Sequence, residues 1–174
     1  MMKHTPERSV SKEIEVLLNK QIEKEFGSWA IYLAMASWAD CKNFVGFPKF
    51  FYKAAQEEMA HGLKIFHYLN DQQGCAVMPA LERPKAVYTS FEDLARAALD
   101  HEIMITNSLQ EIYKAALVEG DFSTVELMQW FIVEQREEED KTRRIVDMFD
   151  IINPPSETCL AMWEIDEEVG EMAE

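Results

Sequence analysis

The chain has 174 residues, of which 48% are hydrophobic and 28% are charged, and its formal net charge is −15. These values are typical of a soluble globular protein with one domain, residues 1–174, and they argue against intrinsic disorder. The acidic excess argues against binding to nucleic acid or to anionic membrane surfaces, and it favours the attraction of cations. Few glycines and prolines, against many Ala, Leu, Met, Glu and Lys, favour helix over sheet.

The beginning of the chain and its cysteines indicate a reducing cytoplasm. The first residues, MMKHTPERSVSKEIE, lack the apolar core of a signal peptide, and the longest uncharged run, Phe26 to Ala39, is too short to span a bilayer. The odd number of cysteines favours neither a disulfide framework nor a zinc knuckle: Cys41, Cys75 and Cys159. We therefore expect an unprocessed cytoplasmic protein whose cysteines are buried as small apolar residues.

Apolar residues recur at helical spacing in the first half of the chain. One helix is expected over residues 10–38. A second is expected from Pro48, which suits a first turn, to Gly74. The periodicity then breaks over residues 75–89, an extended stretch that reaches roughly 50 Å and can return along a whole helix. The helices on either side of this crossover are therefore expected to be parallel.

The spacing of a capping box, a hydroxyl residue three positions before a glutamate, predicts the start of two further helices: Thr89 with Glu92, and Ser123 with Glu126. The first of these is expected to end at Gly120 and the second at Asn153. A short final helix is expected from Ser156 to about Val169. Four helices of nearly 30 residues, each about 40 to 45 Å long, predict an all-α four-helix bundle with a long crossover and a short fifth helix.

Glutamates interrupt the apolar face of each long helix near its middle. The candidate residues are Glu25, Glu58 with His61 one turn later, Glu102, and either Glu134 or Glu138. Because mid-helix positions meet at one level in a bundle, these side chains are expected to converge. A lone helical glutamate usually lies on a solvated face. Four buried unpaired carboxylates, however, would consume most of the roughly 5 to 15 kcal/mol by which a domain is stable, so counter-ions are required.

The charge of this polar layer suits a pair of metal ions. Four carboxylates balance two divalent cations, and no Lys or Arg lies near the centre of these helix faces. Ligands rich in oxygen, with one neutral imidazole and no thiolate, suit Fe²⁺ or Mn²⁺ better than structural Zn²⁺. Glu58 and His61, three residues apart on a helix, can hold one ion together, and Glu58 can bridge to the second.

Five segments, taken in order, resemble those of bacterial non-haem ferritins: QIEKEFGSWAIYLAMASW, AQEEMAHGLKIFHYL, DHEIMIT, TVELMQWFIVEQREEE and CLAMWEIDEEV. The resemblance covers nearly the whole chain and implies a ferritin-like four-helix bundle with a fifth helix. It implies that Glu25, Glu58 and His61 bind one iron. It also implies that Glu58, Glu102 and Glu138 bind the other.

The resemblance implies further roles around the two irons. Gln135 would be a ligand of one iron or a hydrogen-bond donor to one of the ligands. Glu57, Glu134 and Glu137 would serve a third iron position that leads toward the inner surface of a shell, although all three suit ordinary exposed positions as well. Tyr32 would hydrogen-bond a ligand or donate an electron during O₂ reduction, where the alternative is a core tyrosine with a buried hydroxyl group.

Two departures from neighbouring families favour a haem-free ferritin. Bacterioferritins and rubrerythrins carry a second Glu-x-x-His pair where this chain has Gln135 and Glu138. Met59 stands where bacterioferritins bind haem between subunits, but related haem-free ferritins also carry Met there. We expect no haem, and we expect Met59 to be an ordinary interface or core side chain.

The function implied by the resemblance is iron storage with ferroxidase activity. Fe²⁺ would be oxidised by O₂ or H₂O₂ at the di-iron site, and the Fe³⁺ mineral would be stored in a homo-oligomeric shell of 24 copies whose fifth helices line a symmetry channel. Two alternatives remain. One is a di-iron or di-manganese redox enzyme that acts on peroxide or a small substrate without storage, and the other is a structural bundle whose glutamates face water. The sequence indicates neither the product of O₂ reduction nor the partner for iron release.

Overall fold

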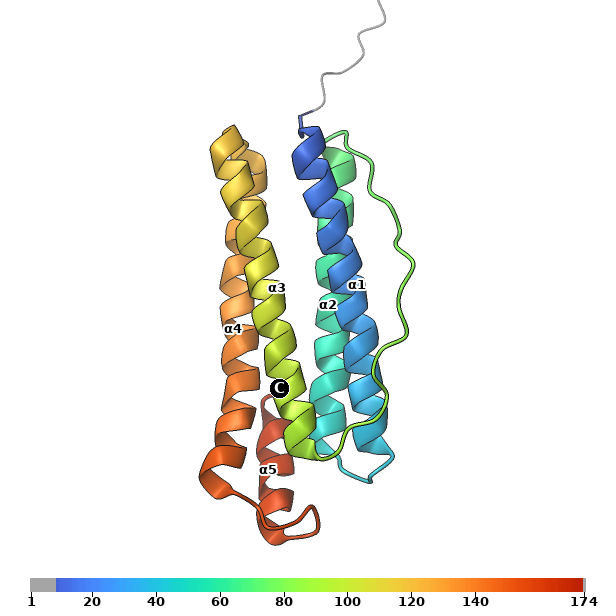
Figure 1. Ribbon diagram of the computed structural model, residues 1–174, viewed down its shortest axis with the longest axis vertical. Coiled ribbons are helices and arrows are strands. Elements are labelled where there is room, and N and C mark those ends of the chain that lie inside the picture. Colours follow the sequence, from blue (N-terminus) through green and yellow to red (C-terminus); the bar gives the residue numbers. More distant parts are fainter. Residues whose placement is uncertain (1–8, 174) are drawn as a thin grey trace, which may run out of the picture.

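The structure is a computed structural model, and it describes residues 9–173 as five helices without a strand (Figure 1). The helices are α1 (Lys12–Asp40), α2 (Gly46–Asp71), α3 (Phe91–Glu119), α4 (Phe122–Ile152) and α5 (Leu160–Glu171). The first four form a long bundle, and α5 lies against one end of it. The predicted all-α bundle with a short fifth helix is confirmed. The prediction that no leader is present rests largely on residues 1–8, which lie outside the described residues.

The crossover between α2 and α3 runs along the bundle from one end to the other, so α2 and α3 point in the same direction, as predicted (Figure 1). Helix α1 packs against α2 and α3, and α3 packs against α4. Asn19 of α1 anchors the crossover, because its side-chain amide donates to the Cys75 carbonyl at 3.0 Å and accepts from the Val77 N–H at 2.8 Å. The side-chain amide of the half-buried Asn19 thus holds the extended segment to the bundle.

Two of the predicted helix starts are wrong. Ser90, not Thr89, is the N-cap of α3, and Asp121, not Ser123, is the N-cap of α4. Each of the two observed caps accepts the backbone N–H three residues ahead, at 3.1 Å and 3.0 Å. For α4, the difference arises because Gly120 takes a left-handed φ of 72° and ends α3 at once, so that Asp121 is already in position to begin the next helix.

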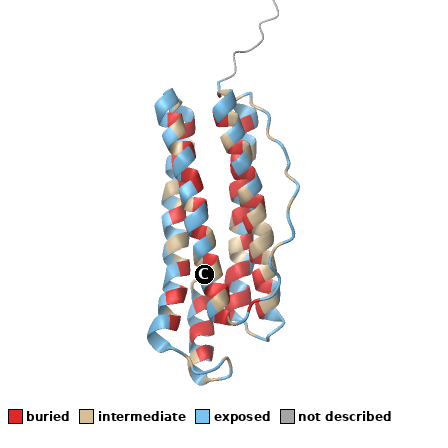
Figure 2. Ribbon diagram, viewed as in Figure 1, coloured by how far each residue is buried: buried red, intermediate tan, exposed pale blue. Residues whose placement is uncertain are grey.

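Two separate clusters of buried apolar side chains fill the bundle, one in each half of its length. Buried residues follow the faces that the helices turn toward one another (Figure 2). In α2, Glu58 separates Ala55 of one cluster from Ile65 of the other, and Glu102 occupies the same place in α3. The glutamates therefore form a polar layer between two dry compartments.

The start of α2 is capped by a residue from α5. Val45, at the N-cap of α2, has no side chain that could accept a hydrogen bond. The buried Asp166 carboxylate instead accepts bonds of 2.8 to 3.1 Å from three backbone N–H groups, those of Val45, Gly46 and Phe47. A carboxylate at this position also complements the positive end of the helix dipole. Helix α5 is thereby tied to its own subunit's bundle.

The contact between α5 and α2 requires glycine on both sides. A Cβ atom at Gly46 would lie 1.6 Å from the Asp166 carbonyl oxygen, and one at Gly170 would lie 2.9 Å from the Gly46 Cα atom. Neither position has room for a side chain. The two backbones can approach this closely only because both residues lack a Cβ atom.

Helix α5 begins later than the predicted Ser156 and ends later than Val169. The reason is that the Ser156 hydroxyl group bonds to Thr158 rather than to a backbone N–H, so it does not cap a helix. The intervening Glu157 accepts instead from the Phe91 N–H at 3.2 Å and from Lys42 at 2.9 Å. These bonds hold the turn before α5 against the start of α3.

Cys41 and Cys159 lie at helix ends and Cys75 lies in the crossover; Cys159 packs against one of the apolar clusters. Cys41 and Cys75 are exposed and Cys159 is half-buried, so the expectation that all three are buried is wrong.

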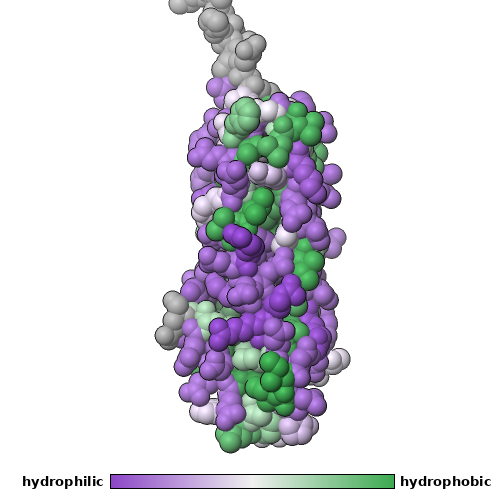
Figure 3. Space-filling view, turned by 90° about the vertical axis from the view of Figure 1, so that its left-hand side faces the viewer, coloured by the Kyte–Doolittle hydropathy of each residue, from purple (hydrophilic) through white to green (hydrophobic). Residues whose placement is uncertain are grey.

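On the face shown in Figure 3, hydrophilic residues cover most of the surface and hydrophobic ones form separate patches. Within residues 9–173, no helix is long and apolar enough to cross a membrane.

Replacing Asp166 with Ala should release α5 from the bundle, because three backbone N–H groups at the start of α2 lose their acceptor. We expect a loss of roughly 2 to 4 kcal/mol in the free energy of unfolding. Urea unfolding measures this loss, and limited proteolysis between α4 and α5 should become faster. Replacing the exposed Glu164 of the same helix with Ala is the matched control. Equal stability of the two variants would contradict the capping role.

Candidate metal centre

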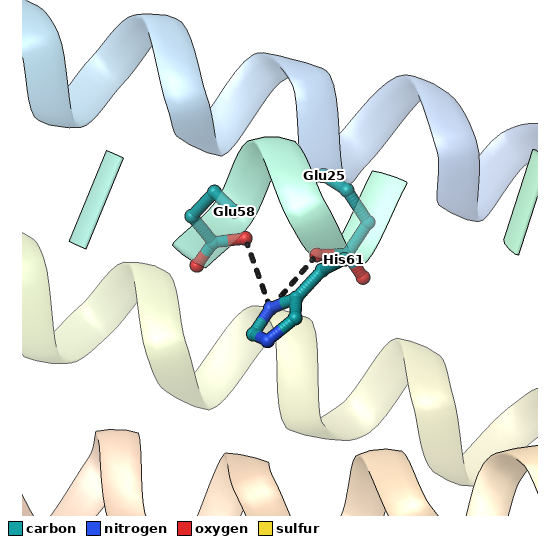
Figure 4. Close-up of side chains that lie close together, drawn as sticks. All are labelled: Glu25, Glu58 and His61. Carbon is teal, nitrogen blue, oxygen red and sulfur yellow. Dashed lines mark ion pairs between the residues drawn. The ribbon is translucent and has the colours of Figure 1, made fainter. Parts of the chain in front are cut away.

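Side chains from all four long helices converge in the polar layer. They are Glu25 of α1, Glu58 and His61 of α2, Glu102 of α3 and Glu138 of α4. Glu25, Glu58 and Glu102 expose only 1%, 2% and 2% of their surface. Figure 4 shows Glu25, Glu58 and His61 pointing toward one another. Helical spacing explains the His61 position, because residues three apart share a helix face and its side chain therefore stands beside Glu58.

The five side chains form two overlapping groups. Glu25, Glu58 and His61 make the first, and Glu58, Glu102 and Glu138 make the second; in each group the candidate ligand atoms lie within 4.8 Å of one another. Glu58 belongs to both groups. Its Oε2 atom is buried and has no hydrogen-bond partner among the described residues. Such an atom is strongly unfavourable unless a cation or proton neutralises it.

The histidine faces three carboxylates at distances longer than a hydrogen bond. Its Nδ1 atom lies 4.0 Å from Glu25 Oε2, 3.8 Å from Glu58 Oε2 and 3.7 Å from Glu138 Oε1. Burial lowers the pKa of His61, so the ring is neutral at physiological pH and can offer a lone pair to a metal ion. Trp130 and Phe131 contact the ring edge-on and keep its orientation.

Both oxygens of Glu102 accept hydrogen bonds from neighbouring side chains. The Tyr32 hydroxyl group donates to Oε1, and the Gln135 side-chain amide donates to Oε2. Gln135 also donates to the Glu102 carbonyl oxygen at 3.3 Å. The structure thus shows Gln135 as a hydrogen-bond donor to a candidate ligand. Tyr32 lies directly beside the polar layer, stacked on Phe51.

Burial and mutual repulsion favour the protonated forms of Glu58, Glu102 and Glu138 when no cation is bound. Burial, followed by the charge of Glu25, raises the pKa of Glu58 well above its ordinary value. Burial is also the largest cause of the raised pKa values of Glu102 and Glu138, which are about 7 and about 9. Metal binding at neutral pH must therefore displace protons.

The donor set fits a pair of divalent cations. It offers carboxylate oxygens and one imidazole nitrogen without a thiolate, which suits Fe²⁺ or Mn²⁺. The shared Glu58 suits a bridging ligand. A cavity of about 20 Å³, the size of one water molecule, adjoins Tyr32, Glu58 and Glu138. Met172 and Ala173, which follow α5, also line this cavity.

The three residues predicted for a third iron are not part of either group. Glu57 and Glu134 are half-buried and Glu137 is exposed. Glu57 lies 4.0 Å from Lys53 Nζ, one helical turn earlier. Among residues 9–173, the structure assembles three-ligand groups only from the five side chains of the polar layer. The third iron position therefore stays a prediction.

A second layer of polar residues, not predicted from the sequence, lies behind Glu25. Gln21 and Ser108 are buried, and Lys24 is half-buried beside them. Gln21 stands four residues before Glu25, a spacing at which an amide and a carboxylate meet on a helix, and this pattern could have identified it. Ser108 lies in another helix, and nothing in the sequence relates it to Glu25.

The metal-free protein should lose stability as the pH rises from about 7 to about 9, at roughly 1 kcal/mol per pH unit, because folded Glu138 still holds a proton there. Folded Glu138 has a pKa of about 9, whereas unfolded glutamate has already released its proton above 4.5. Glu102, with a folded pKa of about 7, makes its contribution mainly below pH 7. Urea unfolding after chelation measures the slope.

The control is the double variant Glu102→Gln, Glu138→Gln, which cannot release these protons. Its stability should depend much less on pH over the same range. An equally steep slope in the variant would show that other groups cause the effect.

Comparisons with known proteins agree with this geometry. The family model described as Ferritin-like domain matches residues 15–152. A probable bacterial non-heme ferritin-like protein of Haemophilus influenzae is 34% identical over 94% of this chain and 98% of its own. A bacterial non-heme ferritin of Campylobacter jejuni is 34% identical over 82% of this chain and 86% of its own.

Comparison with solved structures agrees with the family match found in the sequence. An open pore ferritin from the archaeon Archaeoglobus fulgidus superimposes with a TM-score of 0.88 at 31% sequence identity, covering 94% of this chain and 98% of that one. The match thus extends over the bundle, the crossover and most of the C-terminal region. The chain belongs to the ferritin family, and bacterial non-haem ferritins are among its relatives.

Proposed function

We propose that this chain is an iron-storage subunit that oxidises Fe²⁺ at a paired site in the centre of its bundle. The observation that carries the proposal is the buried Oε2 atom of Glu58, which lies among other carboxylates without a hydrogen-bond partner in the described part of the chain. Leaving such a charge unpaired costs on the order of several kcal/mol, and a cation between the carboxylates removes that cost. Membership of the ferritin family supports iron as the cation.

Fe²⁺ is the substrate of this reaction, and each half of the site would hold one ion. Glu25 and His61 hold the ion on their side, with the neutral imidazole completing a mainly oxygen set. Glu102 and Glu138 hold the ion on the other side. Glu58 lies in both groups and bridges the two. Carboxylates suit the task because they bind both Fe²⁺ and Fe³⁺ and can move between terminal and bridging positions.

Tyr32 supports the half of the site that contains Glu102. Burial, followed by the charge of Glu102, raises its pKa well above 10, so the hydroxyl group keeps its proton and donates it to Glu102. This bond orients the ligand. We propose in addition that Tyr32 lies close enough to supply an electron when the oxidant is reduced.

The reaction transfers electrons from iron to O₂ or H₂O₂. Each Fe²⁺ loses one electron, so the pair supplies two electrons to one oxidant molecule. Fe³⁺ then leaves the site, hydrolyses with release of protons and is stored as mineral. Because one subunit cannot enclose a mineral, we propose a homo-oligomeric shell, and the resemblance to ferritins suggests 24 copies. The net charge of −15 favours attraction of Fe²⁺ to the protein.

Adding Fe²⁺ in air and then separating the products by gel filtration tests the storage function. We expect on the order of a thousand irons to elute with a large oligomer, because mineral grows beyond the paired site. About two irons per chain on a small oligomer would indicate a redox enzyme without storage. The absence of bound iron would indicate a structural bundle and refute the proposal.

Replacing Glu58 with Ala should slow the initial oxidation of Fe²⁺ by roughly 100-fold or more, because the substitution removes a ligand shared by both ions. Stopped-flow absorbance of the Fe³⁺ product measures the rate. The shell should still assemble, since removing an unpaired buried carboxylate does not destabilise the metal-free bundle. Replacing the exposed Glu23 of α1 with Ala is the control and should leave the rate unchanged. Fast oxidation in the Glu58 variant would contradict the bridging role.

A further inference from the structure

Behind the paired site, a fully buried glutamine contacts one of the candidate ligands. We propose that Gln21 is a positioning residue that holds Glu25 so that a single carboxylate oxygen faces the His61 half of the site. This inference rests on the proposed function, because it assigns a role to Gln21 in binding the first of the two ions. It goes beyond that function in predicting which half of the site Gln21 controls.

The geometry divides the two oxygens of Glu25 between different tasks. The Gln21 side-chain amide donates to Oε1 at 2.7 Å, whereas Oε2 lies 4.0 Å from the His61 Nδ1 atom. Gln21 is 0% exposed, so water does not compete for this hydrogen bond. The bond between Gln21 and Glu25 therefore holds Oε1 away from the metal side and presents Oε2 to it.

A relay of hydrogen bonds from the half-buried Lys24 fixes the orientation of the Gln21 amide. Lys24 Nζ donates to Ser108 Oγ at 2.5 Å, and the Ser108 hydroxyl group donates in turn to Gln21 Oε1. With its oxygen satisfied by Ser108, the amide must turn its N–H₂ group toward Glu25. The relay connects α1 to α3, and it brings a positive charge to the outer end of the network.

The three most buried carboxylates differ in what their oxygens contact. Both oxygens of Glu102 accept hydrogen bonds, from Tyr32 and Gln135. One oxygen of Glu25 accepts from Gln21, and one oxygen of Glu58 has no partner within residues 9–173. Each half of the site thus has its own set of amide or hydroxyl donors, and Gln21 serves only the half that contains His61.

A role in packing alone predicts a different outcome from a role in positioning. Replacing Gln21 with Leu keeps the volume nearly constant and removes one polar group from the interior, so packing and stability should change little. The Glu25 carboxylate, however, would lose its fixed orientation. Loss of an outer hydrogen-bond partner of a ligand typically lowers metal affinity by about 10-fold to 100-fold.

The test is titration of the assembled, metal-free protein with Co²⁺, a divalent ion that O₂ does not readily oxidise when carboxylates bind it. Visible absorption reports the ligand environment, and equilibrium dialysis reports the number of ions and their affinity. We expect the unmodified protein to bind two Co²⁺ per chain. In the Gln21→Leu variant one of the two should bind about 10-fold or more weakly, with a changed spectrum, and the other should bind as before.

Two further variants separate positioning from general damage. Gln110→Leu makes the same chemical change at an exposed site on α3 and should leave both affinities unchanged. Ser108→Ala removes the group that orients the amide, so it should weaken the same ion as Gln21→Leu, by a smaller factor. It also provides the test if Gln21→Leu does not fold.

The outcomes distinguish this inference from the proposed function. If the unmodified protein binds no Co²⁺ pair, the paired site and with it the proposed function are refuted. If it binds the pair, and neither Gln21→Leu nor Ser108→Ala weakens one ion selectively, the positioning role alone is refuted. Equal weakening of both ions would likewise contradict it, because Gln21 contacts only the half of the site that holds Glu25.

Discussion

Four carboxylates lie in a layer of the bundle from which water is largely excluded, and their repulsion constrains the surrounding structure. Burial raises the pKa of Glu102 to about 7 and that of Glu138 to about 9, so either protons or cations must occupy the layer. Hydrogen-bond donors from Tyr32, Gln135 and Gln21 satisfy individual carboxylate oxygens around it. The apolar clusters on either side keep the layer dry, which strengthens each of these interactions. The donor set of carboxylates and one imidazole suits a pair of divalent cations such as Fe²⁺ or Mn²⁺.

Contacts far from the layer keep the helices in the register that this site requires. Asn19 holds the crossover against α1, and Asp166 joins α5 to the start of α2. The close approach of Gly46 and Gly170 makes the second contact specific. Because a shift of a helix by one residue would rotate every glutamate away from its partners, these anchors bear on metal binding although they touch no ligand.

Much of the fold follows from local rules. Helical periodicity gave the number and approximate length of the helices, and the length of the crossover gave the parallel direction of α2 and α3. Local rules failed at boundaries. Thr89 and Ser123 have the spacing of N-caps, but Ser90 and Asp121 occupy those positions, and α5 begins at Leu160 rather than at Ser156. Several residues near a boundary can cap a helix, and the turn that precedes it decides among them.

The sequence by itself determined which helix faces carry glutamates and that these lie at similar depth, because the helical repeat is a property of the local backbone. Helical spacing left Glu134 and Glu138 open, and the resemblance to ferritins pointed to Glu138, which the tertiary structure places in the layer. Only the tertiary structure decided that Gln135 donates to Glu102 and that Gln21 lies behind Glu25. The physical reason is that such choices depend on the rotation of each helix about its axis and on side chains from other helices. Hydrogen bonds form over about 3 Å, a precision that helical spacing alone does not provide.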